Sequence, residues 1–188
     1  IKYNKHYKGI ICLDYRNRIR KNINVFVPFV FCNKIVFKYI DTFQQNNNIL
    51  AKKIRLCVNK LIDTNITCIG GESYLYGLIN SHINYNYYTN SEKLYIEAEH
   101  NKQNTSFLVN YNTTNSIYFY NYVIINLSKI NNNLITLINK SHIKKLIIIS
   151  CKHTDFWKKI KKLKTYKSLK RIKFININYF ITVNIFIF

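Results

Sequence analysis

Cys151 is the candidate nucleophile of this chain. Its thiol directly follows the apolar run 146–149 and Ser150. A run of branched aliphatic residues predicts a buried strand, and the end of such a strand lies at the edge where open α/β sheets bind ligands. The thiolate is the nucleophilic form of cysteine, and the neighbouring cations Lys152 and His153 would favour it. The alternative is a buried or incidental cysteine, since free cysteine is among the most buried residue types.

Two more candidate sites are expected at the same edge. Gly70 and Gly71 lie between an apolar run at 65–69 and a helical pattern, where a loop lets a nucleotide-type ligand approach backbone N–H groups. A tight turn that needs positive φ explains the two glycines equally well. Asn126 and Ser128 end the apolar run 122–127, and the alternative there is an ordinary strand end.

The elements that would position these residues alternate along the chain. Hydrophobic periodicity predicts strands at 9–13, 25–31, 34–40, 65–69, 85–89, 107–111, 122–127, 145–150, 172–179 and 182–188, and helices at 45–62, 74–83, 91–101, 131–139 and 155–163. From residue 62 onward, strand and helix alternate, which is typical of a parallel sheet with helices on its faces. We therefore expect an α/β fold over 41–188, preceded by a β-rich segment over 1–40.

The charge of the chain indicates a polyanionic partner. Lys and Arg number 29 against 8 Asp and Glu, which gives a formal net charge of +21, and such a protein attracts RNA or DNA. The densest run contains no acid and consists of Lys158, Lys159, Lys161, Lys162, Lys164, Lys167, Lys170, Arg171 and Lys173. Trp157 and Tyr166 could stack on bases beside it, which suggests an RNA-binding face. A solvated helix face is the alternative.

The five cysteines argue against a disulfide framework and against a structural metal site. Their number is odd, their spacings are wide, and no CxxC pair occurs. We therefore expect no metal and a reducing intracellular compartment. No signal-peptide pattern opens the chain, and no apolar stretch reaches the roughly 20 residues of a membrane span.

Four segments of the chain match motifs in the order in which one enzyme family carries them. Residues 43–47 read F-Q-Q-N-N and are similar to an F-x-Q-x-N motif. Residues 68–74 are similar to a glycine-rich cofactor loop, C-G-x-G-x-F, and 125–129 fall where the family has D-P-P-R. Residues 148–151, with Phe156 and Leu163 after them, resemble its Y-I-S-C-N-P segment. In these segments the chain resembles the RNA uracil-5-methyltransferases, class I enzymes that use S-adenosylmethionine.

The resemblance implies a Rossmann-like methyltransferase sheet with helices on both faces, a tRNA or rRNA substrate and a set of site residues. Cys151 would be the catalytic nucleophile, and Phe43 would position the target base. S-adenosylmethionine would be held by Gly70, Gly71, Gln45 and Asn126. RNA would also meet the cations and the aromatic of the basic run, namely Lys158, Lys161, Lys162, Tyr166, Lys170 and Arg171.

The chain departs from the family's pattern at its acids. Asn126 replaces the D-P-P aspartate, and the acid that binds the cofactor ribose falls near Thr89 or Asn90. The family's last motif, P-x-T-x-H-V-E, falls on 180–186, which puts Phe186 in place of the general-base glutamate. A general base is typically worth about 10²–10⁴-fold in rate. The sequence therefore predicts an RNA-binding, methyltransferase-like protein. It is either a strongly diverged enzyme or a relative that has lost catalytic activity and binds RNA. A non-enzymatic RNA-binding or ribosomal component is the alternative.

Overall fold

A computed structural model describes residues 26–39, 42, 48–101, 105–151, 154–164, 166–176 and 179–187. The strands are β1 (Phe26–Phe31), β2 (Lys34–Tyr39), β3 (Ile66–Ile69), β4 (Tyr85–Thr89), β5 (Thr105–Leu108), β6 (Tyr122–Asn126), β7 (Lys145–Cys151), β8 (Lys170–Asn176) and β9 (Tyr179–Ile187). The helices are α1 (Asn48–Asn59), α2 (Tyr74–Ile79), α3 (Glu92–His100), α4 (Asn132–Lys140), α5 (Thr154–Ile160) and the short 3-10 helix η1 (Tyr166–Ser168). The expected strand at 9–13 lies outside the described residues.

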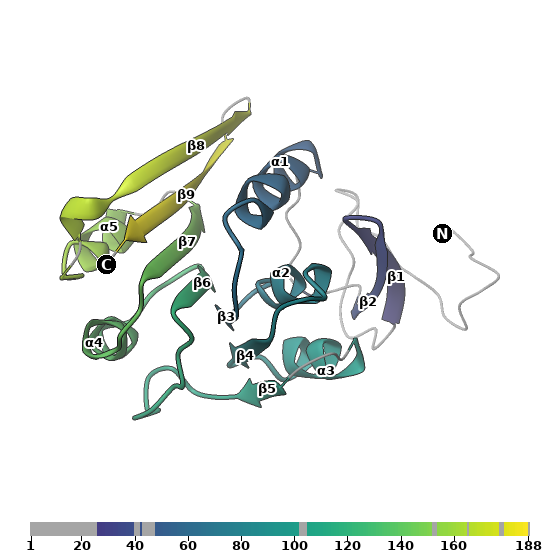
Figure 1. Cartoon of the computed structure of the whole chain (residues 1–188), viewed down its shortest axis with the longest axis horizontal. Helices are drawn as coiled ribbons and strands as arrows, with labels where there is room; N and C mark the ends of the chain where they lie inside the picture. The colour runs from purple at the N-terminus through teal and green to yellow at the C-terminus, as the bar shows by residue number, and fades with distance from the viewer. Residues whose placement is uncertain are drawn as a thin grey trace, which may run out of the picture.

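Seven strands form one sheet in the order β5-β4-β3-β6-β7-β9-β8 (Figure 1). β3 to β7 are parallel to one another, whereas β9 runs antiparallel to both β7 and β8. The chain passes from β3 outward to β5 and then returns to β6, so the strand order reverses between β3 and β6. In open α/β sheets the crevice at such a reversal is the usual ligand site.

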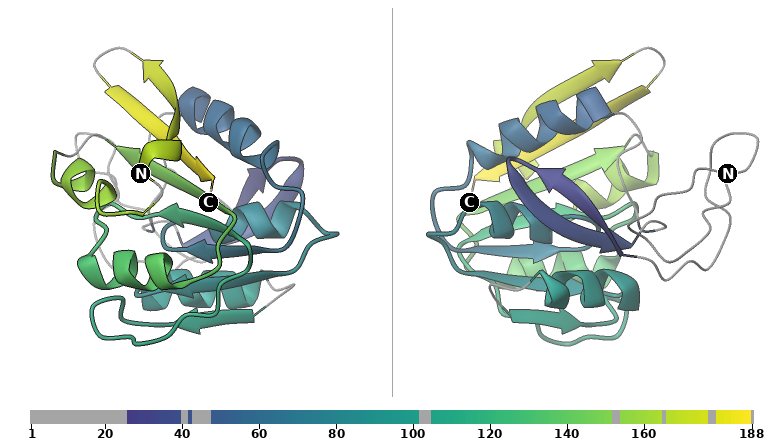
Figure 2. Two further views of the ribbon diagram at one scale, coloured as in Figure 1. Left: turned by 60° about the vertical axis from the view of Figure 1, so that its left-hand side comes forward. Right: turned by 90° about the vertical axis from the view of Figure 1, so that its right-hand side faces the viewer.

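Helices cover both faces of this sheet, as the sequence predicted (Figure 2). Alternate residues of one strand enter two separate cores, because side chains in a strand point to opposite faces. Ile124 packs with α1, α2 and α3, whereas its neighbours Val123 and Ile125 pack with α4 and α5. The strands β6 and β7 are buried on both faces, which explains their continuous runs of branched aliphatic residues.

Two helix starts follow directly from capping side chains. Ser91 accepts a hydrogen bond from the backbone N–H of Leu94 at 3.4 Å, and Asn131 accepts one from Leu134 at 2.7 Å. Such side chains satisfy N–H groups that have no partner within the helix. Ser91 and Asn131 are therefore the N-caps of α3 and α4.

The strands β1 and β2 form a separate hairpin that packs beside α3 (Figure 2). Cys32 and Asn33 connect them with φ of +46° and +66°, as a tight two-residue hairpin turn requires. Phe31 and Val36 belong to the same hydrophobic core as α1 and α2. The β-rich character expected before residue 40 is therefore confirmed for 26–39, and this hairpin shares its core with the α/β sheet.

A helix side chain bonds the outer edge of β2. The Asn101 amide accepts a hydrogen bond from the backbone N–H of Phe37 at 2.7 Å and donates one to the Phe37 carbonyl at 2.6 Å. Both polar groups of Phe37 therefore point away from β1, where its partner is Pro28. Proline has no N–H to donate, and it is tolerated at this position because the ladder needs no bond there.

Candidate functional site at the carboxyl edge of the sheet

The sheet register brings three of the predicted site residues to one edge. Ile69 pairs with Ile125, so Gly70 and Asn126 follow as neighbours at the ends of β3 and β6. Asn126 pairs with Ile149 in β7, and Cys151 ends that strand two residues later. Gly70, Asn126 and Cys151 thus lie on adjacent strands at the carboxyl edge. The structure describes the backbone of Cys151 and not its side chain.

The two glycines have a geometric reason for being glycine. Gly70 has φ of +69° and Gly71 has φ of +48°, a region that strains other residues. A Cβ on Gly70 would lie 2.1 Å from Cδ2 of Leu127, and one on Gly71 would lie 2.7 Å from the carbonyl oxygen of Asn126. The space beside the glycines is therefore filled by Asn126, which ends β6, and by Leu127, which follows it.

Tyr111 closes the same edge between β3 and β4. Its side chain is buried, and its hydroxyl donates a hydrogen bond to the carbonyl oxygen of Tyr88. Burial raises the pKa of Tyr111, while hydrogen bonding to Thr89 and to the backbone of Asn90 and Gly70 opposes that rise. The tyrosine hydroxyl thus lies where the ends of β3 and β4 meet. This contact could not be inferred from the sequence, because Tyr111 comes from the loop after β5.

The end of β4 carries Thr89 and Asn90 where a ribose-binding carboxylate was expected from the resemblance. A ribose diol is bound by a carboxylate, and the residue at the end of β4 is Thr89, which is fully buried. Tyr111 bonds to the same strand end, and Leu127 packs against Gly70. Thr89 and the backbone at Gly70 are therefore in contact with Tyr111 and Leu127 of the same chain.

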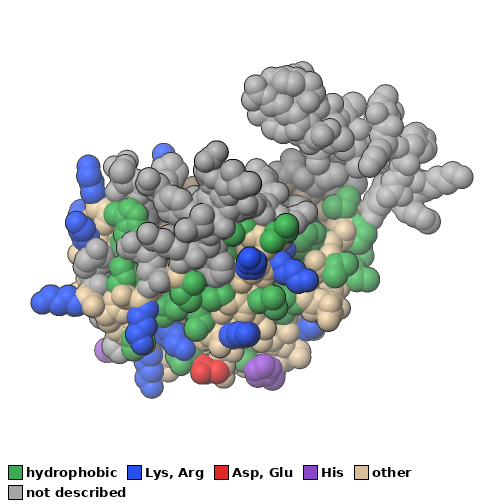
Figure 3. All heavy atoms as spheres, turned by 90° about the horizontal axis from the view of Figure 1, so that it is seen from above, with side chains coloured by type: hydrophobic (Ala, Val, Ile, Leu, Met, Phe, Trp, Pro, Cys, Tyr) green, Lys and Arg blue, Asp and Glu red, His purple; other side chains and the backbone are tan. Residues whose placement is uncertain are grey.

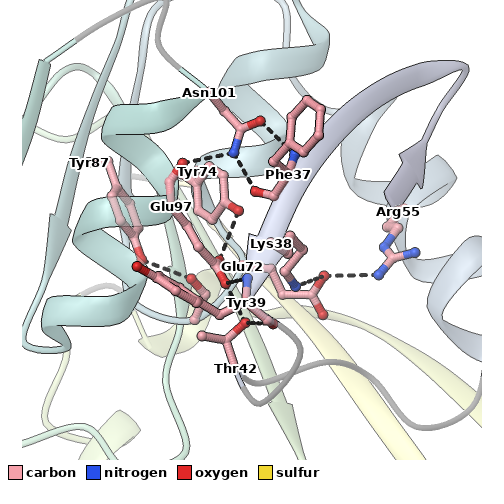
Figure 4. Close-up of polar contacts among 11 residues, drawn as sticks. Phe37, Lys38, Tyr39, Thr42, Arg55, Glu72, Tyr74, Tyr87, Glu97 and Asn101 are labelled. Atoms are coloured by element: carbon pink, nitrogen blue, oxygen red, sulfur yellow. Dashed lines mark hydrogen bonds and ion pairs between the residues drawn. The ribbon is translucent and has the colours of Figure 1, made fainter. Parts of the chain in front are cut away.

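Glu72 is the carboxylate nearest the glycine pair in the sequence. It forms ion pairs with Lys38 of the β1–β2 hairpin and with Arg55 of α1 (Figure 4). Its Oε2 lies 2.9 Å from Nη2 of Arg55 and 3.8 Å from Nζ of Lys38. Glu72 is 5% exposed and Lys38 is 0% exposed, so this is a buried charge cluster. The structure places this carboxylate between the two cations Arg55 and Lys38.

A second buried carboxylate joins the hairpin to the body of the protein. Glu97 of α3 accepts hydrogen bonds from the backbone N–H of Tyr39 at 2.7 Å, from the Tyr74 hydroxyl at 3.1 Å, and from the Thr42 hydroxyl (Figure 4). Burial raises the pKa of Glu97, and the Thr42 hydrogen bond opposes this rise. Sequence reasoning missed this cluster. A buried acid and a buried lysine have no recognisable pattern of their own.

The register of β9 contradicts one expectation about the catalytic base. Phe186 lies opposite Leu146, whereas Ile181 lies opposite Cys151. β9 runs antiparallel to β7, so its later residues move away from the carboxyl edge, and five residues of strand (146 to 151) correspond to about 17 Å. Phe186 is buried in the core beneath α4 and α5. The position that the sequence aligned with the general base therefore lies along β9 away from the end of β7.

The basic run forms an exposed surface after β7. The lysines with exposed side chains are Lys158, Lys161, Lys162, Lys164, Lys167 and Lys170. Asn139 of α4 holds the backbone of this segment, because its amide bonds the carbonyl of Lys162 and the N–H of Lys164, each at 3.0 Å. Trp157 packs partly against the core and is half-buried. The side chains of Tyr166 and Arg171 lie outside what the structure describes, as do Phe43 and Gln45.

Neither a membrane helix nor a metal cluster is found in the described part of the chain. In those ranges no helix is both long and apolar enough to cross a bilayer. Three or more His, Cys, Asp or Glu side chains do not gather anywhere among the same residues.

The fold is that of the class I methyltransferases. No family model and no curated protein sequence matches the chain significantly. The Pyrococcus abyssi tRNA (uracil-54, C5)-methyltransferase, solved with S-adenosyl-L-homocysteine, superposes with a TM-score of 0.71 and 14% identity over 90% of this chain. The chain spans 46% of the length of that enzyme.

Two further solved structures share the fold. TYW2 of P. horikoshii, in complex with MeSAdo, gives a TM-score of 0.63 at 7% identity, over 92% of this chain and 75% of its own. TrmK of M. capricolum, in complex with S-adenosyl-homocysteine, gives 0.51 at 17% identity, over 71% of this chain and 67% of its own. The structural neighbours thus include RNA methyltransferases, and identities this low establish the fold alone.

Proposed function

We propose that this chain is an RNA-binding protein built on the class I methyltransferase fold and that it binds RNA without transferring a methyl group. The exposed lysine surface after β7 supports RNA binding, because surface cations bind phosphates whatever the sequence of the RNA. The contacts of Tyr111 with Tyr88 and Gly70 carry the second half of the proposal, because they occupy the strand ends that the cofactor ribose would need.

RNA binding is tested by fluorescence anisotropy with a tRNA transcript over a series of salt concentrations. The logarithm of the binding constant should fall linearly with that of the salt concentration, with a slope that counts the phosphates neutralised. The variant Lys164→Gln should reduce this slope. Lys60→Gln is the matched control, because Lys60 is also exposed and follows α1 on the other face of the sheet. Salt-independent binding would contradict the proposal.

Cofactor binding is tested by calorimetry with S-adenosylmethionine on the same preparation. We expect no heat of binding up to millimolar cofactor, while RNA binding by the same sample shows that the protein is folded and active. Micromolar binding of S-adenosylmethionine by the wild-type chain would refute this half of the proposal and leave RNA binding untouched.

A second function, RNA uracil-5-methylation, is favoured by one observation. Cys151 ends β7 at the same edge at which Gly70 and Asn126 adjoin. A thiolate there could add to a pyrimidine ring and form a covalent intermediate. This candidate predicts transfer of a labelled methyl group to RNA that is abolished by Cys151→Ala. The first candidate predicts no transfer and equal RNA binding by the wild-type chain and that variant.

A further inference from the structure

A groove lies between the β1–β2 hairpin and helix α1, away from the carboxyl edge of the sheet. Its volume is about 630 Å³, within the range of small-molecule sites. The lining residues are Phe29, Val30, Cys32, Asn33, Lys52, Arg55 and Leu56. None of these lining residues is acidic, and neither the basic run nor the sheet edge includes them.

One wall of the groove carries a preorganised cation. The Arg55 guanidinium lies 5.1 Å from the ring centroid of Phe29 and 4.8 Å from that of Phe31, and Nη2 bonds Glu72. The rings and the carboxylate fix its orientation, so little side-chain entropy remains to be lost on binding an anion. A guanidinium has five N–H donors in total, and the contact with Glu72 is made through Nη2.

The other walls are apolar and open to solvent. Val30 is 68% exposed and Leu56 is 47% exposed, whereas Phe29 is half-buried beside Arg55. Lys52 is exposed on α1 and adds a second cation to the rim. Aliphatic and aromatic walls beside cations match a nucleotide, which has an apolar base face and an anionic phosphate.

The groove also lies near β8, the strand that carries the end of the basic run. Helix α1 packs against β8, the strand that begins with the exposed Lys170. Where this face of the molecule is drawn in colour, lysine and arginine side chains are interspersed with hydrophobic ones (Figure 3). An extended polyanion bound along β8 could therefore continue into the groove, which favours an RNA strand over a peptide as the occupant.

We propose that the groove between the β1–β2 hairpin and α1 binds one nucleotide unit of a single-stranded RNA segment. Its phosphate contacts Lys52 and Arg55, and its base lies against Val30 and Leu56. This inference rests on the proposed RNA binding and adds a site that the basic run does not provide.

A pair of neighbouring lysines on α1 tests the phosphate contact. Lys52 lines the groove and Lys53 does not, although both are exposed. For a single-stranded oligouridylate of about eight nucleotides, Lys52→Ala should raise the dissociation constant about tenfold, the value of one charge-assisted hydrogen bond. It should also reduce the salt slope by about 0.7. Lys53→Ala changes the net charge equally, and its effect should stay within about twofold.

A second pair tests the apolar contact without changing any charge. Leu56 lines the groove, whereas Ile49 is 70% exposed on the same helix and does not line it. Leu56→Ala should weaken binding of the oligouridylate several-fold, and Ile49→Ala should leave it unchanged. Equal effects within both pairs would overturn the groove site.

Cysteine alkylation reports occupancy of the groove directly. Cys32 is exposed at the groove, whereas Cys57 is half-buried and Cys68 is buried. Saturating oligouridylate should slow the reaction of Cys32 with N-ethylmaleimide, followed by mass spectrometry of its peptide, and should leave Cys57 unaffected. RNA binding with unprotected Cys32 would refute the groove and leave the RNA-binding function standing. If the wild-type chain does not bind RNA at all, the proposed function itself is refuted.

Discussion

Removing one charge from the Lys38, Glu72 and Arg55 cluster should cost different amounts of stability depending on which charge is removed. Glu72 lies 3.8 Å from Lys38 and 2.9 Å from Arg55, so it is the anion between two cations. At an effective dielectric constant of about 20, a pair at the Lys38 distance attracts by about 4 kcal/mol before desolvation is subtracted. Lys38 is 0% exposed, so its ammonium has no contact with water in the folded chain.

Glu72→Gln should therefore lower the free energy of unfolding by about 3 kcal/mol, because it leaves the buried ammonium of Lys38 without this partner. Lys38→Met should change it by about 1 kcal/mol or less, because Glu72 keeps Arg55 and the methionine fills a similar volume. Urea denaturation followed by the fluorescence of Trp157 measures both values. Glu92→Gln, an exposed acid at the start of α3, is the control and should change the stability by less than about 0.5 kcal/mol.

The pH dependence provides an independent check on the Lys38 assignment. Burial lowers the pKa of Lys38 below its ordinary value of 10.5, so the unfolded chain binds this proton more tightly than the folded chain does. The contribution of Lys38 to stability therefore rises as the pH increases from the folded pKa toward 10.5. The wild-type chain should gain stability relative to Lys38→Met over that window. The reasoning is refuted if Lys38→Met costs as much as Glu72→Gln at neutral pH.

Three further predictions concern the edge of the sheet and its helices. Gly70→Ala should destabilise the fold by about 2 kcal/mol or more in urea denaturation, because it adds left-handed strain to a clash with Leu127, and Leu127→Ala in the same chain should not restore the wild-type value. Asn131→Ala removes the cap on Leu134 and should cost about 1 kcal/mol in the same assay, so an unchanged midpoint would contradict the capping role. Burial raises the pKa of Tyr87 well above 10.0, so stability should fall as the pH rises past that value, since only the unfolded chain ionises there. Phenolate absorbance should then appear together with unfolding, and an earlier appearance would count against this burial.

Much of the fold follows from local sequence patterns. The segments that form β6 and β7 are continuous runs of branched aliphatic residues. The residues before α3 and α4 are Ser91 and Asn131, which are residue types that favour the N-cap position. The carboxyl-edge argument expected Gly70 and Asn126 at the same edge because parallel strands end on the same side, and the structure pairs their strands directly. The sequence predicted two closing strands, but their order in the sheet was not predictable. β9 lies between β7 and β8, and that choice depends on long-range pairing.

The parts that escaped prediction depend on tertiary contacts of single side chains. Lys38 shares the inward face of β2 with Val36, whereas Ile35 and Phe37 point outward, which inverts what polarity alone predicts. The turn at Cys32 and Asn33 sets this register, and a single pattern of alternation cannot choose between the two faces. Tyr111 reaches the ends of β3 and β4 from a loop, whose path no periodicity describes.

The contacts between α3 and β2 have a consequence for how copies of this chain meet in solution. An unpaired strand edge is a template that a second molecule can extend, and a lone two-stranded hairpin is only marginally stable. Here the amide of Asn101 and the carboxylate of Glu97 bond the backbone of Phe37 and Tyr39, as a third strand would. Side chains of a helix thus protect the hairpin from intermolecular strand addition, and their loss should favour aggregation before it favours unfolding.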